Sequence, residues 1–173
     1  TYAAPVLHRL NIPATFFVVP GRMGQMLDHD TDPQTSVLMT GEEVRELESM
    51  GFSVGCHTLS HRRLSFLDEQ AQRDEIMEGT RLLASQLGHA VEAFAYPFGS
   101  AADYNKTSVQ LVREAGFRYA VSNRYGVNRP GCDPWTLRRI WIDATDALTM
   151  FRAKVEGRLD VLSALDSTLG LRL

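Results

Sequence analysis

Short β-rich runs alternate strictly with helical patterns along this chain, and that alternation is the feature that most restricts its fold. Residues 14–19 form a continuous apolar run closed by Pro20 and Gly21, which predicts a strand buried on both faces. Further strands are predicted over residues 52–56, 91–96, 117–122 and 137–142, and helices over residues 3–10, 40–50, 65–87, 104–115 and 146–155. Such an alternation is typical of parallel βαβ units, which either close into a barrel or form an open doubly wound sheet.

The size and charge of the chain exclude several classes of protein. Its 173 residues, 44% apolar and 23% charged, suffice for one full-sized domain with a sizeable core. The net charge of -3 implies no broad basic surface, so nucleic acid is not expected as a partner. No apolar run approaches the roughly 20 residues that cross a bilayer, which predicts no transmembrane segment. Cys56 and Cys132 are distant in sequence and are expected to be free, mostly buried thiols.

Two histidines four residues apart, His57 and His61, directly follow the predicted strand 52–56. If the turn begins a helix, both imidazoles share one face and can bind one zinc-like ion. Pro97-Phe98-Gly99 and Asn123 also follow predicted strands, and the carboxyl ends of parallel strands lie at one rim. We therefore expect these residues to meet there, although an isolated pair with this spacing more often consists of surface or core histidines. No glycine-rich phosphate-binding motif follows any strand, which argues against a nucleotide fold.

The segment His57-Thr58-Leu59-Ser60-His61 resembles the H-[ST]-x-x-H metal motif of the polysaccharide deacetylases, carbohydrate esterase family four. The run from Phe94 to Gly99 resembles the next motif of that family, in the variant where alanine replaces an arginine. Leu137-Arg138-Arg139-Ile140 resembles the late strand that supplies an arginine to the substrate groove. The resemblance extends in the right order over nearly the whole chain, residues 2–156.

This resemblance implies both a fold and a reaction. The fold is a distorted (β/α) barrel of about seven strands, formed by a single domain over residues 1–173 with a C-terminal extension at residues 158–173. The reaction is hydrolysis of N-acetyl groups on an N-acetylglucosamine-type polysaccharide or oligosaccharide. It requires a divalent metal, usually zinc, which polarises the acetyl carbonyl and lowers the pKa of a water molecule. The expected partner is an N-acetylated glycan, and analogy alone favours an exported or cell-envelope location, with the cytoplasm as the alternative.

The same resemblance assigns roles to individual residues. His57 and His61 are the metal ligands, and Thr58 hydrogen-bonds within their loop and fixes it. The backbone N–H of Phe98 faces the oxyanion of the reaction, while Pro97 sets the turn. The further candidates are Arg139, as the residue that orients the catalytic base, and Tyr96, Pro97 and Trp135, as residues that contact the sugar.

Three departures from the family pattern bear on activity. The first motif of the family, a strand ending in T-F-D-D-G, supplies the catalytic base and the third metal ligand, and it is absent from these residues. It would lie just before Thr1, so we expect either further chain upstream or a poorly stable fragment with an open sheet edge. Ala95 replaces the arginine that orients the base, a task that Arg139 can take over from a neighbouring strand. No histidine follows His89, so the late L-x-x-H acid motif has no counterpart.

Two other functions stay open on the sequence. The missing aspartates allow a non-catalytic sugar- or metal-binding member of the same fold. The scaffold also suits a hydrolase that acts on the amide bond of a small molecule. Long open loops at the rim would favour a polymer, and a capped pocket would favour a small substrate.

Overall fold

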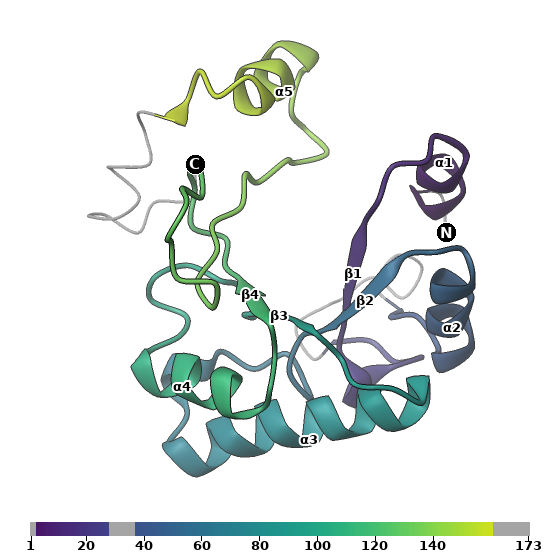
Figure 1. The fold of residues 1–173 in the computed structure, drawn as a ribbon, viewed down its shortest axis with the longest axis vertical. Coiled ribbons are helices and arrows are strands. Elements are labelled where there is room, and N and C mark those ends of the chain that lie inside the picture. The colour runs from purple at the N-terminus through teal and green to yellow at the C-terminus, as the bar shows by residue number, and fades with distance from the viewer. Residues whose placement is uncertain (1–2, 28–36, 161–173) are drawn as a thin grey trace.

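Four short parallel strands organise the residues that the computed structural model describes, which are 3–27 and 37–160. The strand order in the sheet is β1-β2-β3-β4, the same as the order in the sequence (Figure 1). All pairings are parallel, so the carboxyl ends of the strands lie at one edge of the sheet. The strands are Thr15–Val18 (β1), Ser53–Cys56 (β2), Ala93–Ala95 (β3) and Tyr119–Val121 (β4). The predicted α/β class with a parallel sheet is confirmed.

Local capping interactions set where the helices begin. The N–H of Glu43 donates to the Thr40 hydroxyl, and the Glu43 carboxylate accepts the N–H of Thr40 at 2.8 Å, which together form a capping box. The Asp68 carboxylate accepts the N–H of Ala71 at 2.8 Å, so the long helix begins after Asp68 rather than at Ser65. The helices are Ala3–Arg9 (α1), Gly41–Ser49 (α2), Glu69–Leu87 (α3), Lys106–Glu114 (α4) and Leu148–Val155 (α5), with short 3-10 turns at Pro20–Arg22 (η1) and Leu64–Phe66 (η2). Among the described helices, none has the length and apolar character that a membrane span requires.

The main core lies between the sheet and the helices on one side of it. Figure 1 shows α3 running along this side with α4 next to it. Ile76 and Leu83 of α3 pack in one buried cluster with Cys56 of β2 and Phe94 of β3, and all four side chains are excluded from solvent. Burying each large apolar side chain contributes about 1.5–3 kcal/mol, so this side of the sheet holds α3 firmly in place.

The first strand is less buried than the sequence predicts. Of the four residues in β1, Thr15, Phe16 and Phe17 are only partly buried, and Val18 is fully buried. The reason is that β1 pairs only with β2 among the described residues and is therefore an edge strand. A continuous apolar run predicts burial on both faces, whereas β1 has one side open in this part of the chain.

Residues 137–142 do not form the predicted strand. Leu137 makes one isolated parallel bridge to Val121 of β4, and the N–H of Arg139 donates to the C=O of Arg124 at 3.2 Å. The backbone N–H and C=O of Arg138 instead bond to the side-chain amide of Asn128, at 2.9 Å each. Because this amide takes the place of a neighbouring strand, the sheet stops, and the described residues contain four strands against about seven in the expected barrel.

The C-terminal part of the chain also differs in detail from the prediction. The last helix begins at Leu148 rather than at Asp146, and its start has no side-chain cap. The Asp146 carboxylate instead accepts two hydrogen bonds from Lys154 Nζ, at 2.7 and 3.0 Å. The predicted extension at residues 158–173 lies mostly outside the described residues, which end at 160.

The two free thiols differ in burial, and they should therefore differ in reactivity. Cys56 is buried at the end of β2, and burial raises the pKa of its thiol to about 12, whereas Cys132 is exposed, contrary to expectation. Because the thiolate is the nucleophile, iodoacetamide at pH 8 should alkylate Cys132 and leave Cys56 unmodified in the folded protein. Peptide mass mapping measures both sites, and equal labelling of Cys56 would show that the end of β2 opens readily.

Candidate functional site

The two histidines lie together at the carboxyl end of β2. His57 follows the last residue of that strand, and its backbone N–H donates to the C=O of Val18 at 2.8 Å. The imidazole rings of His57 and His61 have centroids 4.7 Å apart, and both rings line a cavity of about 780 Å³. The turn does not begin a helix, so a loop rather than a shared helix face brings the rings together.

The surroundings of His57 keep its ring neutral and fix its tautomer. Nδ1 lies 2.7 Å from the C=O of Ala95, and because a carbonyl can only accept, Nδ1 carries the proton. Burial is the main reason that the pKa of His57 falls to about 3, and the neighbouring His61 and Arg139 contribute to the same shift. A neutral imidazole with its Nδ1–H bonded to a carbonyl presents the Nε2 lone pair, which is the form that binds metals.

The loop between the histidines has an unusual backbone conformation. Thr58 and His61 have φ of 63° and 65°, in the left-handed region that favours glycine. The buried Thr58 hydroxyl accepts the backbone N–H of His61 at 3.0 Å, and this bond bridges the two strained positions. Strain of this kind persists where surrounding contacts over-determine the conformation, and it is common at functional sites.

The Pro97-Phe98-Gly99 corner lies next to the histidines. The Phe98 ring centroid is 5.0 Å from that of His61, and Phe98 lines the same cavity. Phe98 and Gly99 have φ of 61° and 74°, which makes a sharp turn directly after β3. The predicted meeting of the histidines and this corner at one rim of the sheet is what the structure shows.

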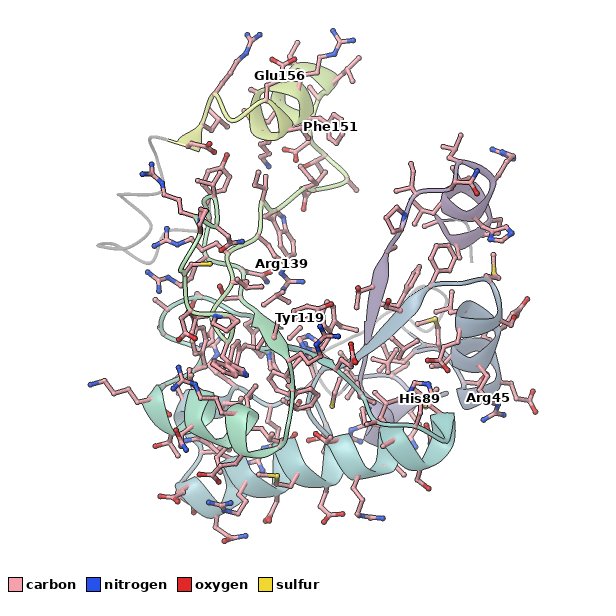
Figure 2. The ribbon with its side chains drawn as sticks, viewed as in Figure 1. Arg45, His89, Tyr119, Arg139, Phe151 and Glu156 are labelled. Atoms are coloured by element: carbon pink, nitrogen blue, oxygen red, sulfur yellow. The ribbon has the colours of Figure 1, made fainter. Side chains whose placement is uncertain are left out.

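A chain of hydrogen bonds connects Arg139 to this corner. Figure 2 shows Arg139 on the segment that follows β4. Its Nη2 donates to Asn123 Oδ1 at 2.6 Å, and Asn123 Nδ2 donates to the C=O of Phe98 at 2.7 Å. Arg139 Nε also donates to the C=O of Ser122 at 2.8 Å. Arg139 thus supports the corner through Asn123 while its own side chain lines the cavity.

Tyr96, Pro97 and Trp135 lie away from the cavity. Tyr96 is fully buried, stacks on Tyr104 with ring centroids 4.1 Å apart, and donates its hydroxyl to the C=O of Trp135 at 2.9 Å. Trp135 donates its indole N–H to the backbone and lies under the guanidinium of Arg113. Pro97 is also fully buried. These side chains therefore support the corner from behind, on the core side of the sheet.

The outer wall of the cavity comes from the segment after Arg139. Trp141 lines the cavity with half of its surface exposed. The Asp146–Lys154 ion pair lines it too, and the two side chains are only 11% and 8% exposed. Trp141 therefore offers the cavity a large apolar ring face beside a polar wall.

The donor set fits a metal ion only in part. Two neutral imidazoles suit zinc, whose catalytic sites use about three protein ligands and one open position. No group of three or more His, Cys, Asp or Glu residues that could hold a metal occurs within residues 3–27 and 37–160. His57 and His61 would therefore supply two ligands of such a site, and a third donor would be needed.

The roles of two residues at the site cannot be recognised from sequence motifs. Asn123 is recognisable as a rim residue, but its bond to Phe98 is not. Glu75 bonds to the histidine loop from α3, and its sequence signal is a carboxylate on the buried face of that helix, in register with Gln72 and Gly79.

Comparisons with known sequences agree with this geometry. The family model for polysaccharide deacetylase matches residues 1–120. YxkH of Bacillus subtilis, named as a polysaccharide deacetylase, is 23% identical over 154 residues, which cover 89% of this chain and 50% of YxkH. The poly-beta-1,6-N-acetyl-D-glucosamine N-deacetylase of Staphylococcus aureus is 23% identical over 149 residues, covering 81% of this chain and 49% of that protein. The chain thus spans about half the length of the curated relatives it matches.

Solved structures show the same fold. IcaB from Ammonifex degensii has a TM-score of 0.72 and 26% identity, over 96% of this chain and 67% of that one. The deacetylase PplD of Streptococcus pyogenes, solved with acetate, has a TM-score of 0.72 and 24% identity, over 88% of this chain and 62% of that one. These likenesses imply the distorted barrel fold. With the family model covering well over half of the residues, the chain belongs to the polysaccharide deacetylase family, carbohydrate esterase family four.

Proposed function

We propose that this chain carries the metal-binding half of an N-deacetylase site acting on an N-acetylglucosamine-type polysaccharide or oligosaccharide. The observation that supports the proposal most is the His57–His61 pair, with rings 4.7 Å apart beside the Phe98 corner in one cavity. The cavity volume of about 780 Å³ is in the range of ligand-binding pockets. A relative that is 23% identical acts, by its name, on poly-beta-1,6-N-acetyl-D-glucosamine, which suggests the class of glycan.

His57 and His61 would hold a divalent ion, most suitably zinc, because both can offer an imidazole nitrogen. When bound, such an ion supplies Lewis acidity toward the acetyl carbonyl and lowers the pKa of a water molecule. The catalytic base and the third ligand are proposed to be aspartates of the family motif T-F-D-D-G, which does not occur in these 173 residues. The four strands would then be part of a barrel of about seven.

The other residues of the site hold the substrate in place and stabilise charge. The backbone N–H of Phe98 is proposed to donate to the oxyanion that forms at the acetyl carbon. Arg139 and Asn123 keep the corner rigid, through bonds of 2.6 and 2.7 Å, so that this donor is already oriented. Sugar contact is proposed for Trp141 rather than for Tyr96, Pro97 or Trp135, which lie behind the corner.

Acetate release and zinc content, measured together on the full-length gene product, test this function. We expect chitooligosaccharides or β-1,6-linked N-acetylglucosamine oligomers to release acetate, and we expect chelation to stop the release and added zinc to restore it. Oligomer binding without acetate release would instead favour the non-catalytic sugar-binding alternative. Release only from small acetamides would favour the small-molecule hydrolase.

A further inference from the structure

The histidine loop lies directly on α3, and its contacts there are close. Leu59 N–H donates to the backbone C=O of Glu75 at 2.8 Å. A Cβ on Gly79, one turn along α3, would lie only 2.8 Å from Leu59 N. Glycine at this position therefore lets the loop rest on the helix backbone, where a larger residue would displace it.

The Glu75 side chain completes this contact. Its Oε2 accepts the backbone N–H of Ser60 at 2.9 Å, and its Oε1 accepts the Ser60 hydroxyl at 2.5 Å. Glu75 is only 5% exposed, so the carboxylate is committed to the loop rather than to water. With its backbone C=O, Glu75 accepts three hydrogen bonds from two consecutive loop residues.

These bonds act between the two imidazoles. Thr58 and His61 occupy the left-handed region, and the residues that Glu75 holds, Leu59 and Ser60, lie between them. From the other side, Gly21 N–H donates to the C=O of Leu59 at 2.9 Å. The loop is thus fixed from both sides, and the Glu75 carboxylate is the charged group that holds the residue next to His61.

We propose that Glu75 is a positioning residue that sets His61 relative to His57 for metal binding. The proposal rests on the proposed metal role of this pair. Glu75 would not contact a bound ion itself. It would act on the ion through its bonds to Ser60 and through the loop backbone. Its loss should loosen the His61 arm and leave His57, which is anchored separately to Ala95 at 2.7 Å, in place. Partners that orient metal ligands typically change metal affinity by about 10–100-fold when removed.

Zinc affinity of Glu75 variants, measured by competition with a chelating dye, tests the proposal. We expect Glu75→Ala to raise the zinc Kd by roughly 10–100-fold. Glu75→Gln should recover most of the affinity, because its amide oxygen can accept the Ser60 N–H and its NH₂ can donate to the hydroxyl. The matched control is Glu78→Ala, which removes a half-exposed carboxylate of the same helix that pairs with Arg81 at 2.8 Å, and it should leave the Kd unchanged.

A second measurement separates loop positioning from metal binding and from folding. In the metal-free protein, the amides of Leu59, Ser60 and His61 should exchange hydrogen faster in Glu75→Ala than in the wild type, while amides in α4 should not change. If Glu75→Ala does not fold, Ser60→Ala replaces it in this test. This variant removes only the hydroxyl that donates to Glu75, so its exchange should increase in the same amides by a smaller amount. Wild-type zinc affinity and wild-type exchange in folded variants would overturn the proposal. A wild-type protein that binds no zinc would contradict the proposed function. Hydrogen exchange of residues 59–61 would still show whether Glu75 holds the histidine loop in place.

Discussion

Replacing His57 with alanine is expected to remove zinc binding and acetate release together, each by more than about 100-fold, since changes behind a ligand alone reach that size. His57 is half-buried, neutral and held by Ala95, so its Nε2 lone pair is already oriented toward a metal ion. Equilibrium dialysis with zinc and an acetate assay measure the two losses. The unfolding midpoint of the metal-free protein shows that the variant is folded.

The control for this variant is His89→Ala. His89 is exposed, and its Nε2 lies 3.0 Å from Glu48 at the far end of α3, next to α2 (Figure 2). An exposed pair of this kind contributes about 0–1 kcal/mol to stability, so zinc affinity and activity should both stay unchanged. Full activity of His57→Ala, or a loss of zinc in His89→Ala, would place the metal elsewhere.

Gly99→Ala should have the second largest effect, a loss of acetate release of about 100-fold, because a misplacement near 1 Å costs that much in catalysis. A Cβ at Gly99 would lie 2.7 Å from the backbone N of Asn123, and two backbones cannot yield as a flexible side chain can. Gly99 also has a φ of 74°, so alanine is strained there in any case. The corner would move away from the histidines, and kcat should fall more than zinc affinity.

Gly116→Ala is the control that separates the steric clash expected at Gly99 from the strain of a positive φ. Gly116 has a φ of 86° after α4, but a Cβ there would meet no atom within 4 Å. It should therefore carry the conformational cost alone, about 1–2 kcal/mol in unfolding free energy, with normal kcat. Equal activity of the two variants would show that the corner at Gly99 does not need its present position.

Local chemistry explains what could be predicted of the fold. The capping box at Thr40 and Glu43 joins residues only three apart, and the sequence displays it, whereas the long helix begins after Asp68 and not at Ser65 as predicted. The failure at residues 137–142 has a non-local cause, because the side-chain amide of Asn128 bonds to the backbone N–H and C=O of Arg138, which a further strand would need for pairing. A strand-like pattern in the sequence does not show which groups will form hydrogen bonds with the backbone of that segment.

The same distinction applies to the site. The His57–His61 pair and the Phe98 corner were predictable, because each directly follows a buried strand and parallel strands end at one rim. Tyr96 was assigned to the sugar side, yet it packs on Tyr104 in the core. A short strand buried on both faces gives no alternation, so the sequence does not reveal which face an aromatic side chain will take.

Anomalous X-ray scattering at the zinc edge from crystals of the zinc-loaded protein tests the central claim most directly. We predict one strong peak at the carboxyl end of β2, about 2.0–2.1 Å from His57 Nε2 and from a ring nitrogen of His61. A zinc peak at His8, His89 or Cys132 instead, with none between His57 and His61, would contradict the account.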